Sequence, residues 1–156
     1  MAIKILHVIS GLSRGGAERV LFNLLKAHKH KADITHIVIC LGGAGALSES
    51  ISALGVELTH LDLKRRWKNI IFLFRLMKFY RPDVVHTWMY HSDIIGGSIA
   101  KLVGYKNIVW SVHHGNPFDL KMLSSTYWCA LISALLSSLI PRYIISPSKD
   151  TCLAHV

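Results

Sequence analysis

Hydrophobic positions along the chain follow two alternating patterns. Short β-branched runs recur, and several are apolar on successive residues, as in Ile37-Val38-Ile39 and Ile108-Val109-Trp110. Continuous apolar runs are typical of strands that are covered on both faces, as the strands of parallel sheets are. These runs predict strands at Ile3–Ser10, Thr35–Leu41, Val56–Leu61, Asp83–Thr87, Asn107–His113 and Arg142–Ser146.

Longer segments with helical periodicity lie between these runs. Gly55, Pro82 and Gly104 stand near the ends of such segments, and both glycine C-caps and proline terminate helices. Strict strand–helix alternation produces right-handed crossovers, so we predict one α/β domain with a doubly wound, mostly parallel, Rossmann-like sheet. The predicted helices are Gly16–His28, Leu47–Leu54, Lys68–Tyr80, Ser92–Val103 and Leu123–Leu139.

The composition narrows the possible partners. The 156 residues are enough for one domain with a sizeable core, and 51% of them are hydrophobic. A formal net charge of +9 favours an anionic partner, which can be nucleic acid, an acidic membrane surface or a phosphorylated ligand. Because no recognised nucleic-acid-binding module accompanies the charge, we expect no nucleic acid partner.

Three features bear on the compartment and on membrane insertion. The amino-terminal apolar run is short and interrupted by charge, unlike a signal peptide. The uncharged stretch Met122–Ile140 carries too many hydroxyl side chains for a strong membrane-insertion signal, so we predict a buried or half-buried helix there. The cysteines are odd in number and lack metal-ligand spacing, which indicates free thiols in a reducing compartment: Cys40, Cys129 and Cys152.

A glycine-rich loop, Gly11–Glu18, follows the first predicted strand and opens the first helix. Ligands of open α/β sheets bind at the carboxyl ends of strands, and a helix N-terminus offers free N–H groups to a phosphate. The glycine spacing matches neither GxGxxG nor a P-loop. A phosphate-binding loop and a tight turn without a ligand are both consistent with it.

Two further loops carry candidate chemistry. The segment His86–Asp93 concentrates aromatic and hydrogen-bonding side chains, which suits a polyhydroxylated ligand but equally suits a packing joint with Ser92 or Asp93 as a helix cap. His113 and His114 are adjacent on a strand, so at most one of them faces the cleft. No HExxH or comparable motif is present, so we expect no metal site.

Four segments in order resemble the amino-terminal domain of glycosyltransferase family 4: IKILHVISGLSRGGAERVLFNL, RPDVVHTWMYHSDIIGGSIAKLVG, NIVWSVHHG and YIISPS. Enzymes of this family have the GT-B fold, in which two Rossmann-like domains face each other across a cleft. The resemblance implies that this chain is the acceptor-side domain alone, with the carboxy-terminal donor-binding domain absent. It also implies that the isolated chain is inactive.

The resemblance assigns roles to particular residues. Gly15 and Gly16 match the loop that lies against the donor diphosphate and the transferred sugar. His113 matches the histidine beside that sugar, because Ser111 fits the family's small hydroxyl residue two positions earlier. The residues expected to bind the acceptor are Arg14, Trp88, Tyr90, His91 and Asn116.

The implied reaction is transfer of a hexose, with retention, from a nucleoside-diphosphate sugar to a cell-envelope or polysaccharide acceptor. The sugar nucleotide is a co-substrate, and neither a metal nor another cofactor is expected. Two alternatives stay open: a noncatalytic domain that binds a glycan, and a GT-B sugar-nucleotide epimerase.

A basic segment, Lys64–Lys68, precedes the third predicted helix. Its cations, together with outward aromatic residues of that helix, suit adsorption to anionic lipid, although a solvated basic face is an equal alternative. We therefore expect a cytoplasmic protein that is peripheral at the inner face of the cell membrane, near lipid-linked acceptors. The positions expected to face the core are Ile70, Leu73, Phe74, Met77 and Tyr80.

Overall fold

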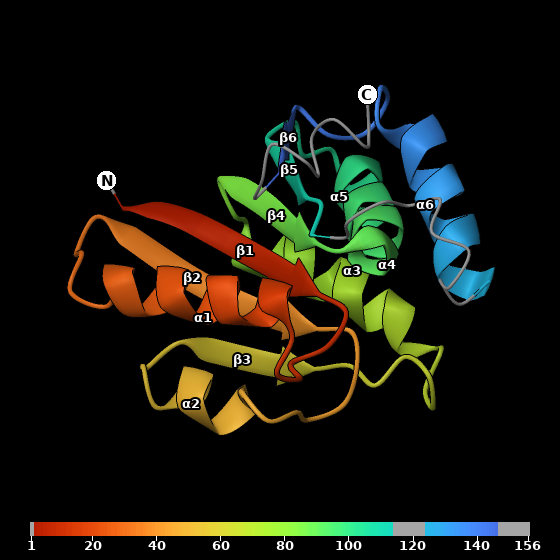
Figure 1. The fold of residues 1–156 in the computed structure, drawn as a ribbon. Coiled ribbons are helices and arrows are strands. Elements are labelled where there is room, and N and C mark those ends of the chain that lie inside the picture. Colours follow the sequence, from red (N-terminus) through yellow and green to blue (C-terminus); the bar gives the residue numbers. More distant parts are fainter. Residues whose placement is uncertain (1, 114–123, 147–156) are drawn as a thin grey trace.

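The computed structural model describes residues 2–113 and 124–146. In these two ranges, six parallel strands form one sheet of order β3-β2-β1-β4-β5-β6 (Figure 1). This arrangement confirms the predicted doubly wound α/β class, and each strand lies close to its predicted range. The strands are β1 (Ile3–Ile9), β2 (Ile34–Cys40), β3 (Glu57–His60), β4 (Val84–Trp88), β5 (Ile108–Ser111) and β6 (Tyr143–Ile145).

The helices cover the sheet in two layers. Figure 1 shows α1 and α2 on one face, over β1, β2 and β3, and α3 and α5 on the other. The helices are α1 (Gly16–His28), α2 (Ser48–Ser52), α3 (Asn69–Tyr80), α4 (Tyr90–Ser92), the π-helix η1 (Asp93–Gly97), α5 (Ser98–Val103) and α6 (Ser124–Leu136).

The segment after β4 differs from the single helix predicted there. It begins at Tyr90 and runs through α4, η1 and α5, so neither Ser92 nor Asp93 caps it. The two glycines of η1 explain how closely it packs on the sheet. A Cβ atom on Gly96 would lie 2.9 Å from Cγ1 of Val8, and one on Gly97 would lie 2.7 Å from Nε1 of Trp110. Any larger residue would push this segment away from the strands.

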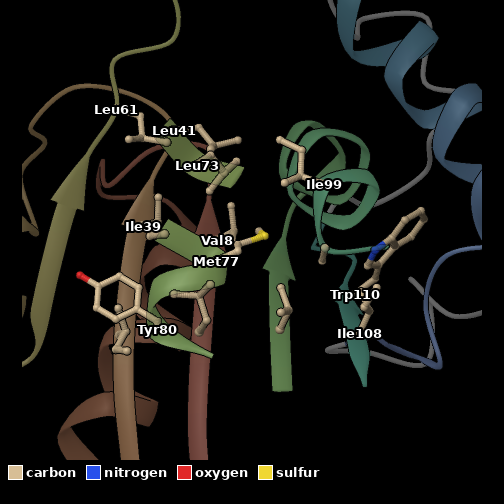
Figure 2. Close-up of a cluster of buried hydrophobic side chains, with 14 of the residues drawn as sticks. Val8, Ile39, Leu41, Leu61, Leu73, Met77, Tyr80, Ile99, Ile108 and Trp110 are labelled. Atoms are coloured by element: carbon tan, nitrogen blue, oxygen red, sulfur yellow. The ribbon is translucent and has the colours of Figure 1, made fainter. Parts of the chain in front are cut away.

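Each face of the sheet has its own core. Successive side chains of β1 alternate, so that Leu6 and Val8 pack toward α3 and α5 while Ile9 packs toward α1 and α2. Figure 2 shows the first of these cores, in which Met77 of α3 and Ile99 of α5 lie against the strands. The parallel strands are thus buried on both sides, as their continuous apolar runs predict.

Helix α3 contributes only part of its predicted core face. Leu73, Met77 and Tyr80 are buried and Phe74 is half-buried, but Ile70 is 40% exposed, so its assignment to the core is wrong. Ile70 occupies the first turn of α3, ahead of the first residue that reaches the sheet.

The apolar stretch around α6 raises the question of a membrane span. None of the helices within the described ranges combines the length and apolar character that a bilayer crossing requires.

A chain of hydrogen-bonded histidines crosses the core on the α1 face. Trp88 Nε1 donates to His7 Nδ1 at 3.2 Å, and His7 Nε2 lies 2.9 Å from His36 Nδ1. His36 Nε2 in turn lies 3.0 Å from His28 Nδ1 at the end of α1. The rings stack as well, with centroids 5.1 Å apart for His7–His36 and 5.2 Å apart for His28–His36. The chain therefore connects β4 through β1 and β2 to the partly exposed end of α1.

Burial keeps the inner rings neutral. Desolvation lowers the pKa of His7 well below its usual value, and the neighbouring histidines add repulsion. The pKa of His36 is lowered by the same two causes. His86 lies opposite His7 in the β1–β4 register, and burial lowers its pKa to about 4. A proton on any of these rings is thus much less stable in the folded state than in the unfolded chain.

This difference predicts acid sensitivity. Between pH 6.5 and about 4, His86 is protonated in the unfolded chain and neutral in the folded protein, so stability is retained above this window and lost as the pH falls through it. His86→Gln removes one such group. We expect the slope of unfolding free energy against pH to decrease by up to ~1.4 kcal/mol per pH unit in this window. Urea unfolding followed by circular dichroism at a series of pH values measures that slope.

The exposed residue His30 provides the matched control, His30→Gln, whose slope should equal that of the wild type. Asp93 acts in the opposite direction, because burial raises its pKa to about 8, but its contribution is common to the wild type and both variants. An unchanged slope in His86→Gln would contradict the assignment of His86 as a neutral buried ring.

Candidate active site

A pocket of about 380 Å³ opens at the carboxyl end of the sheet. Its walls come from the residues that directly follow three neighbouring strands, β1, β2 and β4, and from the segment after β3. This is where ligands of open α/β sheets bind. The lining residues are Ser10, Gly11, Ser13, Glu18, Leu41, Gly42, Leu63, Lys64, Met89, His91 and Ile95.

Glu18 places a buried carboxylate in this pocket. It lies in the first turn of α1 and is only 5% exposed. Ser13 Oγ donates a hydrogen bond to its Oε1 at 2.7 Å, and the carboxylate packs so tightly over Gly15 that a Cβ atom there would collide with it. The partial positive charge of a helix N-terminus stabilises a carboxylate at this position. An ionised carboxylate only accepts hydrogen bonds, so this wall of the pocket suits a ligand that donates hydroxyl protons.

The glycine loop lies beside the pocket. Gly15 is the N-cap of α1, and Gly16 opens the helix with no atom within 4 Å of a Cβ built on it. Gly16 and Arg14 are exposed, whereas Gly11 and Ser13 form the pocket wall. The roles predicted for Gly15 and Gly16 against a donor diphosphate, and for Arg14 against an acceptor, stay predictions.

Met89 forms the wall between β4 and α4 in an unusual backbone conformation. Its φ of 71° and ψ of 154° lie in a region that residues other than glycine rarely adopt. The backbone N–H donates to the carbonyl of Ser111 at 3.1 Å, and the side-chain sulfur accepts from Ser10 Oγ at 3.8 Å. The ends of β1 and β5 therefore hold this strained residue in place. Backbone strain of this kind concentrates at functional sites.

The three residues predicted from the loop after β4 lie in different surroundings. His91 is exposed and lines the pocket. Trp88 and Tyr90 are each 2% exposed and belong to the core. Tyr90 instead lines a second cavity of about 200 Å³ against α6. Any effect of Trp88 on a ligand is therefore exerted through the residues that it contacts.

His113 lies at the same edge of the sheet, next to Trp88. It is half-buried, and its ring stacks on the indole with centroids 5.3 Å apart and an interplanar angle of 19°. Two residues earlier on β5, Ser111 Oγ lies 2.8 Å from His86 Nε2. His114 and Asn116 lie outside the described residues.

Asp93 is the first residue of η1 and is fully buried. Thr87 Oγ1 donates to its Oδ1 at 2.5 Å, yet burial raises the carboxyl pKa to about 8. At neutral pH this carboxyl group is therefore mostly protonated and serves as an uncharged hydrogen-bonding group. Within the part of the chain that the structure describes, no three His, Cys, Asp or Glu side chains converge as metal ligands.

Sequence reasoning predicted His91 but missed the other polar side chains that line the pocket. Glu18 had a recognisable signal, because it is an acidic residue in the first turn of a helix that follows a glycine loop. Lys64 was interpreted only as part of a basic surface, although it follows the end of β3 and so stands at the ligand-binding edge. The convergence of Ser10 and Ser13 with them depends on the strand order, which a single sequence does not reveal.

Comparison with known proteins places this geometry in a family. Residues 14–152 match the model of Glycosyltransferase Family 4. The capsular polysaccharide biosynthesis glycosyltransferase CapH of Staphylococcus aureus is 29% identical over 112 residues, which make up 72% of this chain and 30% of CapH.

Solved structures share the fold. HepE of Anabaena, solved in complex with UDP, has a TM-score of 0.75 and 15% identity over 98% of this chain and 40% of its own. The UDP-GlcNAc 2-epimerase of Methanocaldococcus jannaschii has a TM-score of 0.65 and 12% identity over 98% of this chain and 42% of its own. This chain thus spans less than half the length of each relative, and its sheet has the Rossmann-like fold that these structures share. Because the family model covers most of its residues, the chain belongs to glycosyltransferase family 4.

Proposed function

We propose that this chain is the acceptor-side domain of a retaining glycosyltransferase that transfers a hexose from a nucleoside-diphosphate sugar to a cell-envelope polysaccharide acceptor. The observation that carries the proposal is the pocket at the carboxyl end of the sheet, where Glu18, Ser13 and His91 offer hydrogen-bonding groups suited to sugar hydroxyls. The name of CapH, a capsular polysaccharide biosynthesis glycosyltransferase, supports the polysaccharide acceptor. The UDP bound to HepE supports the nucleotide donor.

The residues of the site have distinct roles in this proposal. Glu18 accepts a hydrogen bond from an acceptor hydroxyl and so orients its oxygen, and Lys64 at the rim attracts anionic groups. His113 donates a hydrogen bond to the transferred sugar. The backbone at Gly15 and Gly16 approaches the diphosphate, whose charge increases as the bond to the sugar breaks. Cationic groups and helix N-termini stabilise that charge, and no metal takes part.

Transfer requires protein beyond these residues in our proposal. The chain corresponds to 30% of CapH and 40% of HepE, while a GT-B enzyme closes its donor site between two domains. A donor-binding domain would therefore complete the site, and the chain by itself would transfer no sugar.

The test is transfer by a full-length enzyme that contains this chain. His113→Ala should lower turnover by about 2–4 kcal/mol in activation free energy, which is roughly 30- to 1,000-fold, because it removes a hydrogen bond that strengthens in the transition state. His114→Ala is the matched control and should lose much less, because the family resemblance assigns the contact with the transferred sugar to His113. Mass spectrometry of the products formed from a panel of sugar nucleotides measures both.

Three outcomes would contradict the proposal. Equal losses for the two histidine variants would reject the role of His113. Sugar transfer by the 156-residue chain at rates typical of enzymes would reject the need for a second domain. Conversion of the sugar nucleotide into an isomer without any acceptor would favour the epimerase alternative, whose fold this chain shares.

We also propose that the chain works in the cytoplasm, attached peripherally to the inner face of the membrane by the basic segment and the start of α3. The residues at positions 64–68 are all exposed. Among them Trp67 is 71% exposed, and Ile71 and Phe72 at the start of α3 are 58% and 46% exposed, so apolar and cationic groups share one surface. Because Lys64 also lines the pocket, this surface lies next to the proposed acceptor site. A lipid-linked acceptor would reach the pocket directly from the bilayer.

Sedimentation with anionic vesicles tests this attachment. Each cation near an anionic surface contributes about 1 kcal/mol, so replacing Arg65, Arg66 and Lys68 by Glu should lower the partition coefficient by ~100-fold or more at low salt. High salt should also release the wild type. The matched control carries three Glu replacements on another surface, at Lys26, Lys29 and Lys31, and should retain binding. Binding that is indifferent to salt and to the first set of changes would reject the proposal.

A further inference from the structure

Trp88 links the histidine chain of the core to His113. Trp88 is 2% exposed, and its indole contacts three imidazoles from different segments of the chain. It donates to His7 on β1, stacks on His86 with centroids 4.4 Å apart, and stacks on His113 with centroids 5.3 Å apart. The last two interplanar angles are 27° and 19°, so the planes of the indole and of the His113 ring are nearly parallel.

The indole also determines the tautomers of the histidines behind it. A tryptophan N–H is only ever a donor, so His7 Nδ1 must accept and the single proton of neutral His7 must lie on Nε2. His7 Nε2 then donates to His36 Nδ1, which places the proton of His36 on Nε2. His36 Nε2 donates to His28 Nδ1 for the same reason. One donor therefore orients three hydrogen bonds.

This chain has a single direction in which every hydrogen bond is made. In the opposite direction, His28 Nδ1–H would donate to His36 Nε2, and each ring behind it would have the other tautomer. His7 would then carry its proton on Nδ1, facing the indole N–H at 3.2 Å, and one hydrogen bond would be lost. The neutral chain is therefore the only arrangement in which every link is made, and it holds His7 as a fixed acceptor for Trp88.

We propose that Trp88 and His7 are positioning residues for His113: the hydrogen bond to His7 Nδ1 fixes the plane of the indole, and stacking on the indole fixes the plane of the His113 imidazole. The proposal rests on the proposed role of His113 beside the transferred sugar. A ring that is stacked on a buried, hydrogen-bonded indole keeps its nitrogens pointing in one direction. Its hydrogen bond to the sugar therefore forms without reorientation of the ring.

The tautomers provide the first test, on the wild-type chain. Nitrogen-15 spectra of labelled histidine side chains distinguish a protonated ring nitrogen from an unprotonated one. We expect His7 and His36 to be neutral with the proton on Nε2 at neutral pH. A proton on Nδ1 of His7 would overturn the proposal, and this measurement needs no variant that must fold.

Two replacements of His7 provide the second test. His7→Leu removes the acceptor, whereas His7→Asn retains an acceptor close to the position of Nδ1. In His7→Leu, the His113 ring protons should lose part of the ring-current shift that the indole causes, and His7→Asn should restore most of it. His60→Leu, which removes a histidine from the edge strand β3, is the matched control and should leave the His113 signals unchanged. His113 signals that are unaffected in His7→Leu would overturn the proposal.

Kinetics of a full-length enzyme separate positioning from general stability. We expect His7→Leu to lower kcat by ~10-fold or more with little change in the donor KM, and His7→Asn to recover most of the loss, because a misplaced ring affects the reaction more than binding. An equal loss in both variants would overturn the proposal. Full turnover by His113→Ala would instead reject the proposed role of His113, and the tautomers would still report whether the indole and His7 are coupled.

Discussion

The parallel pairing of β1 with both β2 and β4 is the constraint on which the rest of the structure depends. From β1 the chain moves outward to β2 and β3, and from β4 it moves the other way to β5 and β6, so the connections diverge at the β1–β4 pair. Where they diverge, loops do not cover the carboxyl ends of the strands. The pocket opens there, between Ser10 and Gly11 after β1 and Met89 after β4. Close packing of Gly96 and Gly97 on the sheet allows the segment after Met89 to begin at that edge.

The two faces of the sheet serve different purposes. The face toward α3 and α5 is an apolar core, whereas the face toward α1 carries hydrogen-bonded imidazoles. A buried polar chain stabilises a fold only when all its members are satisfied, and it then specifies one arrangement of side chains. Here that arrangement ends at Trp88, directly beside His113. The polar face thus connects the interior of the domain to the edge where the site lies.

The charge of the pocket is more balanced than the composition implies. The protein carries a net charge of +9, yet the N-terminus of α1 is faced by the carboxylate of Glu18 rather than left open. A carboxylate there accepts hydrogen bonds from neutral ligands with hydroxyl groups. The cationic residues concentrate instead at the rim and on the adjoining surface, beginning at Lys64. In our proposal, the groups that recognise sugar and those that attract anionic partners therefore lie in one pocket and on the surface that adjoins it.

By itself the sequence determined the fold class, because apolar runs and helical periodicity are local properties that the backbone of each segment obeys. The approximate bounds of the strands and the ligand-binding edge followed from that alternation, and the four family segments indicated glycosyltransferase family 4. Only the tertiary structure decided which side chains meet. Trp88 was expected to shape the acceptor pocket but is buried in the core, whereas Glu18, which was not predicted as a site residue, lines the pocket. The sequence does not reveal this because burial depends on contacts between residues far apart in the chain. The histidine chain has the same origin: residues 7, 28, 36 and 88 share no sequence motif, and their rings come within hydrogen-bonding distance through the parallel pairing of β1, β2 and β4 and the packing of α1 on the sheet.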